Sequence, residues 1–356
     1  MDSVTWYKDF HPHWWKYHDI IVNAPMAFYY FLGTFFAVVG FLGVFGNIIV
    51  VWVFSSTPSL RTPSNVLVIN LAICDILFSA LIGFPMSALS CFQRHWIWGN
   101  FGCQFYSFVA GITGLASINC LAVIAVDRYL VVGQPLAMLN QSHFRRSFYH
   151  VLIIWTWACV WSAMPLIGWG EYILEGFGVS CTFDYLTRTT WNISFNVCLF
   201  TFCFGMPVSV IILSYIGIIR SIAKNRKEFS SLTAENSSRA RQEIKIAKVF
   251  AVCMTAFILC WVPYATVAQL GIYGYDQMVS PYTAELPVML AKTSALWNPI
   301  IYAFSHPKYR KCLKELPIFR QKRKFRFLGS KSHTKSSDGV GTIALTSTIN
   351  RTATRH

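Results

Sequence analysis

The segment IIVNAPMAFYYFLGTFFAVVGFLGVFGNIIVVWVFSSTPSL, residues 20–60, contains no Lys, Arg, Asp or Glu. Because about 20 apolar residues suffice for a helix to cross the hydrocarbon core of a bilayer, the segment is long enough to span it. Within the hydrocarbon, backbone N–H and C=O groups must bond inside the segment, which makes it helical. The segment therefore predicts a transmembrane helix.

Six further stretches have the same character. Four carry no charged residue, and two are each interrupted once, by Asp75 and by Lys292. The six stretches are residues 95–126, 147–170, 189–219, 249–275, 62–93 and 286–307. With 54% hydrophobic and 13% charged residues, the 356-residue chain is too apolar for a soluble domain. We expect an all-α membrane protein with seven transmembrane helices.

Basic residues are distributed unevenly between the two ends of these helices. Apart from Lys292, all but four Lys and Arg residues fall on one side, at Arg61, in residues 128–146 and 220–248, and after residue 307. The positive-inside rule makes this side cytoplasmic and puts the N-terminus outside. The formal charge of +15 then belongs to loops beside an acidic inner leaflet of the membrane. It does not indicate nucleic-acid binding.

Two of the eleven cysteines stand apart from the others, most of which lie within the helices. Cys103 is at the outer start of the third helix, and Cys181 is in the outer loop before the fifth. Since both face an oxidising compartment, we expect a disulfide that holds this loop over the bundle, with Cys91 as the competing partner. The sequence has no CxxC, HExxH, GxSxG or P-loop motif, so nothing supports a metal or hydrolytic site.

Five short motifs follow one another along the helices. They are GN at 46–47, NLAICD ending at residue 75, DRY at 127–129, CWVPY at 260–264 and NPIIY at 298–302. Polar side chains inside a bilayer need partners within the bundle, so Asn47, Asp75 and Asn298 are expected to share a water or sodium network, or simply to hold the helices together. Pro263 and Pro299 remove backbone hydrogen bonds and predict bends.

This ordered set resembles the motifs of rhodopsin-like G-protein-coupled receptors over residues 28 to about 317. The resemblance implies a cytoplasmic switch in which Arg128 pairs with Asp127 and Glu243, and is freed when the sixth helix moves outward. Without the other motifs, Arg128 would equally suit an arginine at a membrane boundary. The remaining members of the expected switch are Tyr129, Asn298, Pro299 and Tyr302.

Lys292 narrows the resemblance further. It lies seven residues before Pro299, a position that resembles that of the retinal-bearing lysine of animal opsins. A buried lysine is disfavoured as a free ammonium, and its neutral amine can condense with an aldehyde. The resemblance implies 11-cis-retinal, bound covalently to Lys292 in the dark as a protonated Schiff base. The alternative is a lysine that pairs with an anionic, diffusible ligand.

A protonated Schiff base requires a negative partner. The helix-three position that carries this carboxylate in some opsins is Tyr106 here. A tyrosine there resembles invertebrate-type opsins, whose counterion lies six residues before the second disulfide cysteine, at Glu175 in this sequence. The alternatives are Glu285, Asp184 and Glu171. The pocket is expected to be apolar and aromatic, and the resemblance places in it Tyr106, Gly114, Trp261 and Tyr264.

The HPKYR run at 306–310 resembles rhabdomeric opsins and melanopsins, which signal through Gq. We therefore expect a light-sensing receptor that activates a heterotrimeric Gq protein from the plasma membrane of a photoreceptor, with arrestin and a receptor kinase acting at the tail. The expected divisions are an extracellular N-terminus (1–27), a seven-helix retinal-binding bundle (28–305), an amphipathic helix on the membrane surface (306–317) and a disordered cytoplasmic tail (318–356).

Other functions remain open, among them a retinal photoisomerase and a receptor for a different G-protein class. The DRY and NPIIY motifs favour signalling without enzyme activity, because an isomerase needs no cytoplasmic switch. A light-driven pump would require carboxylates along a transmembrane path, and only Asp75 lies deep within a helix.

Overall fold

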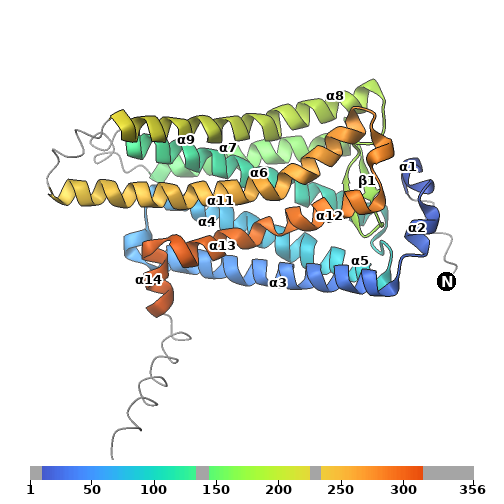
Figure 1. Ribbon diagram of the computed structural model, residues 1–356, viewed down its shortest axis with the longest axis horizontal. Coiled ribbons are helices and arrows are strands. Elements are labelled where there is room, and N and C mark those ends of the chain that lie inside the picture. The colour runs from blue at the N-terminus through green and yellow to red at the C-terminus, as the bar shows by residue number, and fades with distance from the viewer. Residues whose placement is uncertain (1–9, 134–143, 225–233, 316–356) are drawn as a thin grey trace, which may run out of the picture. The chain divides into compact units, whose positions relative to one another are not determined.

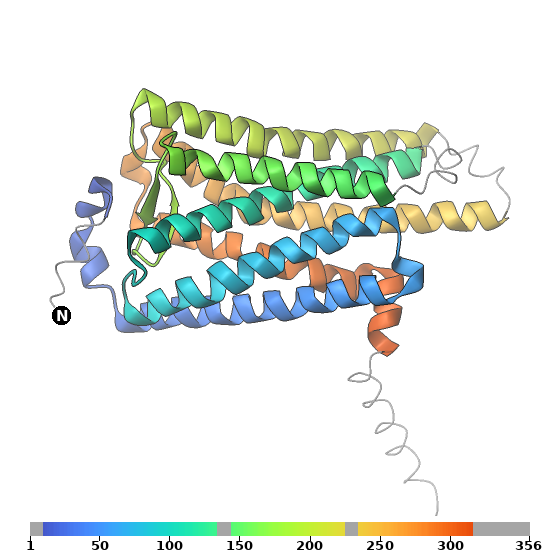
Figure 2. The same cartoon turned by 180° about the vertical axis from the view of Figure 1, so that it is seen from behind.

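Seven helical passages lie side by side in this computed structural model (Figures 1 and 2), which describes residues 10–133, 144–224 and 234–315. In chain order they are α3 (Met26–Ser56), α4–η3–α5 (Pro63–Leu77, Phe78–Ser87, Ala88–Gln93), α6 (Gly99–Gly133), α7 (Phe144–Ala163), α8–η6–α9 (Thr190–Cys198, Leu199–Gly205, Met206–Lys224), α11 (Ala234–Ile272) and α12–α13 (Pro281–Lys292, Ser294–Ser305). Among the described residues, six passages are long and apolar enough to cross a membrane. The seventh is divided at Thr293 into two 12-residue helices. The predicted seven-helix bundle is confirmed.

Short elements connect the passages. They are η2 (Pro58–Leu60), η5 (Met164–Ile167), η7 (Asp276–Met278) and, after the seventh passage, α14 (Pro307–Glu315). The chain divides into two units, Met1–Cys312 and Leu313–His356, and nearly all described residues belong to the first. The tail predicted to be disordered, residues 318–356, lies outside the described residues.

The outer surface of the bundle is apolar. The side chains of Phe41, Leu152, Leu213 and Phe304 are all more than half exposed. On a soluble monomer, such apolar surface would promote association, whereas in a bilayer it contacts acyl chains.

Two passages contain wide π-helical turns, η3 and η6. Pro85 lies inside η3, where its missing N–H interrupts the regular hydrogen-bond pattern. The wide turns change which side chains face inward, and η3 ends at Ser87, which is fully buried.

The seventh passage begins with a well-capped helix. The Ser280 and Thr283 side chains form a capping box before α12, and Pro281 occupies its first position. At the division, the Thr293 hydroxyl donates to the carbonyl of Leu290 at 2.7 Å. The break therefore lies six residues before Pro299, and α13 runs through that proline to Ser305.

A two-stranded hairpin covers one end of the bundle, the end predicted to be extracellular. Strand β1 (Tyr172–Glu175) pairs antiparallel with β2 (Ser180–Phe183), with Leu174 opposite Cys181. Cys181 forms a disulfide with Cys103 at the start of α6, with Cα atoms 5.4 Å apart. The predicted pairing is present, and the competing Cys91 is a buried free thiol.

The N-terminal helices α1 (Pro12–Trp15) and α2 (His18–Val22) pack on this hairpin. The indole of Trp14 is fully buried and donates to the Leu174 carbonyl at 3.2 Å. The ring of Phe10 occupies the space beside Gly178, whose φ of +70° also favours glycine. The disulfide thus links the hairpin to α6, and α1 packs on the hairpin through Trp14.

Candidate functional site

Lys292 is the last residue of α12, and its side chain is buried, at 6% exposure. Its Nζ donates to Ser87 Oγ at 2.6 Å, and Ser87 Oγ lies 3.0 Å from the Tyr106 hydroxyl. Nζ is also 4.1 Å from the ring centroid of Phe36 and 5.4 Å from that of Tyr106. Among the described residues, Lys292 makes no ion pair. The amine therefore lies among rings and a hydroxyl.

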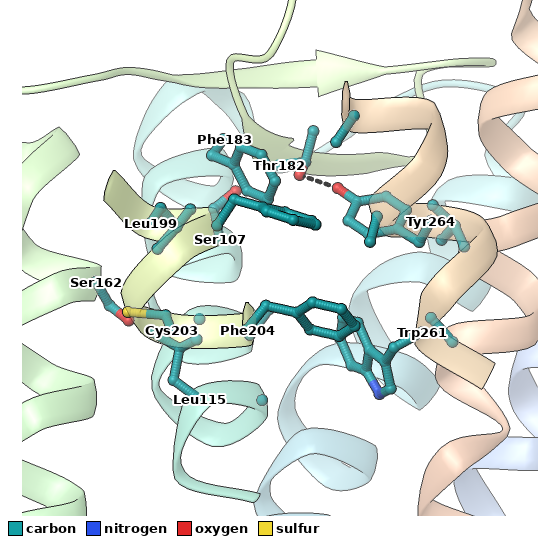
Figure 3. Close-up of a pocket in the computed structure, with 18 of the residues that line it drawn as sticks. Ser107, Leu115, Ser162, Thr182, Phe183, Leu199, Cys203, Phe204, Trp261 and Tyr264 are labelled. Atoms are coloured by element: carbon teal, nitrogen blue, oxygen red, sulfur yellow. Dashed lines mark hydrogen bonds between the residues drawn. The ribbon is translucent and has the colours of Figure 1, made fainter. Parts of the chain in front are cut away.

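A cavity of about 200 Å³ extends from Lys292 between α6, α11, η6 and the hairpin. Figure 3 shows Thr182 and Phe183 on one side of it, and Phe204 and Trp261 on the other. The lining is mainly apolar and aromatic, as a site for an extended apolar ligand requires.

The four pocket residues predicted from the sequence all line this cavity: Tyr106, Gly114, Trp261 and Tyr264. The Trp261 indole donates to Ser294 Oγ at 3.2 Å, and its ring meets that of Tyr264 edge-on with centroids 6.2 Å apart. A Cβ at Gly114 would contact Trp261 Cη2 at 3.5 Å, so glycine leaves room beside the indole. The hydroxyls of Tyr264 and Thr182 are hydrogen-bonded across the cavity, joining α11 to β2 (Figure 3).

Glu175, the last residue of β1, lines the same cavity and is 2% exposed. The Tyr185 hydroxyl donates to its Oε1 at 2.6 Å. The pKa of Glu175 is raised to about 8, chiefly because the carboxyl is buried. The nearby Glu285 also raises this pKa, whereas the hydrogen bond from Tyr185 and the charge of Lys292 lower it. Negative charge on Glu175 is thus favoured by positive charge at Lys292.

The three alternative carboxyls differ in setting. Glu285 on α12 is 1% exposed, and neither of its oxygens has a partner among the described residues. Asp184 accepts hydrogen bonds from the backbone N–H groups of Leu186 and Thr187 at 2.8 and 2.9 Å, so it stabilises the loop. Glu171 is exposed.

At the opposite end of the bundle, predicted to be cytoplasmic, Arg128 forms two ion pairs, one of which connects α6 to α11. Arg128 bonds to the carboxylate of its neighbour Asp127, and its Nη1 donates to Glu243 Oε2 at 3.1 Å. Tyr129 has no part in these ion pairs. It is 39% exposed and its ring lies against Gly217 of α9.

Polar residues in the middle of the bundle join three helices. Asn298 Nδ2 donates to Asp75 Oδ2 at 2.9 Å, and Asn47 Nδ2 donates to the Ala295 carbonyl at 2.9 Å. Pro299 explains the second bond, because a helical proline leaves the carbonyl four residues earlier without its usual donor.

Tyr302, the last residue of the NPIIY motif, is buried among aromatic rings. Its ring centroid lies 6.0 Å from that of Phe54 and 5.9 Å from that of Phe250. It therefore packs between α3 and α11, apart from the Asn298–Asp75 bond.

Several residues of the site were missed from the sequence, among them Ser87, Phe36, Tyr185 and Ser294. Serines and phenylalanines are frequent in these helices, so type and spacing give no signal for Ser87, Phe36 or Ser294. Tyr185 lies ten residues after Glu175, and the hairpin that brings the two together was not predicted.

Comparisons with known proteins agree with this architecture. Residues 46–302 match the family 7 transmembrane receptor (rhodopsin family). The chain is 40% identical over 321 residues to "Rhodopsin" of Loligo forbesii, covering 87% of this chain and 70% of that one. It is 40% identical over 311 residues to "Rhodopsin, GQ-coupled" of Mizuhopecten yessoensis, covering 85% and 62%. To "Melanopsin" of Phodopus sungorus it is 39% identical over 300 residues, covering 83% and 64%.

The crystal structure of squid rhodopsin matches the fold with a TM-score of 0.83 and 37% identity, covering 92% of this chain and 96% of that one. The seven passages, the motifs and these similarities have a common explanation. The chain belongs to the rhodopsin family of G-protein-coupled receptors, as an opsin-like, multi-pass membrane receptor and not an enzyme.

Proposed function

We propose that the protein is a light-sensing opsin that binds retinal at Lys292 and activates a heterotrimeric G protein of the Gq class. The observation that carries the proposal is the position of the Lys292 amine, buried at the end of an apolar cavity with a serine hydroxyl as its closest polar partner. An amine in such a setting suits covalent attachment of an apolar aldehyde better than recognition of a free anion.

The residues present fit retinal. The aromatic walls and the small Gly114 suit an extended polyene, and Lys292 supplies the nucleophile. When bound as a protonated Schiff base, retinal would supply absorption of light and a change of shape. The protein would supply the surroundings of the linkage: Ser87 orients Nζ, the rings of Phe36 and Tyr106 exclude water, and Glu175 provides the negative charge.

A single helix leads from the cavity to the cytoplasmic side. Trp261 lines the cavity and belongs to α11, the same helix that carries Glu243 near its cytoplasmic end. A ligand that displaces Trp261 would bias the position of α11, and Glu243 would then separate from Arg128. In this proposal the Arg128–Glu243 contact keeps the receptor inactive in the dark.

The Gq class is supported by the "Rhodopsin, GQ-coupled" relative and by the HPKYR run. The proposal includes the plasma membrane of a photoreceptor cell as the location. The sites proposed for arrestin and receptor kinase fall in residues 318–356, outside the described residues.

The test is to express the full-length chain, add 11-cis-retinal and record the absorption spectrum before and after light. We expect visible absorption, a retinal adduct that peptide mapping places on Lys292, and light-evoked calcium release that a Gq inhibitor abolishes. Lys292→Ala should abolish the pigment, whereas Lys308→Ala, which changes a lysine of α14 outside the cavity, should not.

Each alternative has its own outcome. An adduct on another lysine would contradict the assignment of Lys292. A light response carried only by cyclic nucleotides would indicate a different G-protein class. Light-driven isomerisation without any G-protein activation would indicate a photoisomerase.

A further inference from the structure

Glu285 is a buried carboxyl to which the proposed function gives no role. It lies on α12, two helical turns before Lys292, and is 1% exposed. A Cβ at Gly176 would lie 3.3 Å from Glu285 Oε2, so this carboxyl touches the turn that directly follows Glu175. The fold thus brings a second carboxyl close to the expected counterion.

The groups that face Glu285 offer it no ion pair. Its electrostatic neighbours are Lys292 on its own helix, Glu175 on β1, Tyr29 on α3 and Cys91 on α5. The Tyr29 hydroxyl donates to the Ile21 carbonyl at 3.1 Å. Arg94 lies over the Tyr29 ring at 5.6 Å, and it forms no ion pair with Glu285 in the described part of the chain.

Lys292 is the cation that acts on both carboxyls. If both were ionised, the buried cluster would hold two negative charges and one positive charge. Two carboxylates that share a buried site repel each other, and an unpaired buried charge is costly, so such a pair tends to retain a proton.

We propose that Glu175 and Glu285 form a coupled acid pair that retains one proton at neutral pH and presents a single negative charge to Lys292. The pair titrates as a unit, so the proton belongs to neither residue alone. The inference rests on the proposed function for the role of this charge beside retinal. The pair itself is a property of the retinal-free chain.

A specific pattern of substitutions follows from the coupling. When either carboxyl is replaced by an amide, the other no longer has a negative neighbour and ionises opposite Lys292. Each single variant should therefore lose the shared proton and still keep one negative charge. Only the double variant lacks that charge.

The first test uses infrared spectroscopy of the full-length, retinal-free receptor in lipid bilayers. We expect a carbonyl stretching band of a protonated carboxyl that shifts in D₂O. Glu175→Gln and Glu285→Gln should each remove this same band. Glu171→Gln, which changes an exposed carboxyl of the same loop, should leave it unchanged. Survival of the band at full intensity in either single variant would overturn the proposal.

Glu285→Asp separates loss of the proton from misfolding, because it retains a carboxyl and is expected to keep the band. With 11-cis-retinal added, each single amide variant should still form a visible pigment at neutral pH, and the double variant should not. A visible pigment in the double variant would also overturn the proposal. If wild type forms no pigment, the proposed function fails, while the infrared result still decides the carboxyl pair.

Discussion

The two ends of the bundle hold buried charge in different ways. At the hairpin end, predicted to be extracellular, Lys292, Glu175 and Glu285 are almost fully buried, and among the described residues none of them forms an ion pair. At the opposite end, predicted to be cytoplasmic, Arg128 forms ion pairs with Asp127 and Glu243, whose side chains are 29% and 33% exposed.

The difference in exposure has a physical consequence. Charges away from water interact strongly, and leaving one of them without an opposite charge is costly. Ion pairs that reach water contribute only about 0–1 kcal/mol, because solvent replaces the lost partner. The hairpin end is therefore suited to hold a ligand in one electrostatic setting, and the opposite end to a contact that opens and closes.

The disulfide holds the hairpin end, and its loss should have the largest effect on stability. Cys103→Ser or Cys181→Ser opens a link across a sequence separation of 78 residues, which should lower the free energy of unfolding by about 4 kcal/mol. Thermal unfolding of the purified receptor measures this change. Cys159→Ser, which changes an exposed free cysteine on α7, is the control and should have little effect. A Cys91–Cys181 peptide found under non-reducing conditions would contradict the pairing.

Removing the carboxyl that lines the cavity should have the next largest effect. Glu175→Gln should lower the pKa of the protonated Schiff base by roughly one unit, or about 1.4 kcal/mol, because Glu285 then supplies the negative charge from outside the cavity lining. A pH titration of the visible spectrum measures the shift, with Glu285→Gln as the matched variant and a smaller expected change. A larger decrease for Glu285→Gln would place the counterion on α12.

Loss of the contact between Arg128 and Glu243 should have a smaller effect than the two changes above. Glu243→Gln removes the charged partner of Arg128 on α11 and should cost the inactive state about 1 kcal/mol, a several-fold rise in dark activity. Basal G-protein activation in membranes is the measurement. Lys245→Gln, an exposed charge on the same helix, is the control. Unchanged dark activity in Glu243→Gln would show that this contact does not restrain the receptor.

The smallest expected effect is a change of stability with pH, caused by a buried histidine at the same end of the bundle. His306, which joins α13 to α14, is 2% exposed and accepts from the Tyr309 N–H at 3.2 Å. Burial, together with the nearby positive charges of Lys308 and Arg128, lowers the pKa of His306 from 6.5 to about 4. Between these pH values His306 binds more protons in the unfolded chain than in the folded protein. The stability of the folded protein should therefore fall as the pH is lowered. We expect a loss of about 1 kcal/mol between pH 8 and pH 6.

Thermal unfolding of wild type and His306→Gln at pH 8 and pH 6 tests this prediction. The variant should lose part of the pH dependence, whereas His18→Gln, which changes a more exposed histidine of α2, should keep all of it. Equal slopes in wild type and His306→Gln would contradict the prediction.

The sequence predicted the features that depend on composition and motif. Charge-free length gave the seven passages, whereas the orientation inferred from the basic residues stays a prediction. The pairing of Cys103 with Cys181 followed from two cysteines on the oxidising side. Motif position gave Trp261 and Tyr264 as pocket residues, and the structure places both in the cavity wall.

Contacts that depend on the rotation and distance between helices were not predictable. Ser87 lies at the end of η3, a wide π-helical segment, and reaches Lys292; Pro85 marks an irregularity in this segment but does not indicate which side chain turns inward. Glu285 was predicted only as an alternative counterion. Its closeness to Glu175 depends on the turn that follows Glu175, and the sequence did not predict the hairpin that positions this turn. The division of the seventh passage at Thr293 depends on a local hydrogen bond, whereas the sequence drew attention to Pro299.

The bond between Asn47 and the Ala295 carbonyl makes two distant positions dependent on each other. With Pro299 in place, Asn47 is the donor that the carbonyl would otherwise lack. If alanine replaced the proline, the α13 backbone would provide a donor of its own, and the asparagine would become partly redundant. Substitutions at the two sites should therefore be non-additive, so that the history of one position restricts which residues the other can accept.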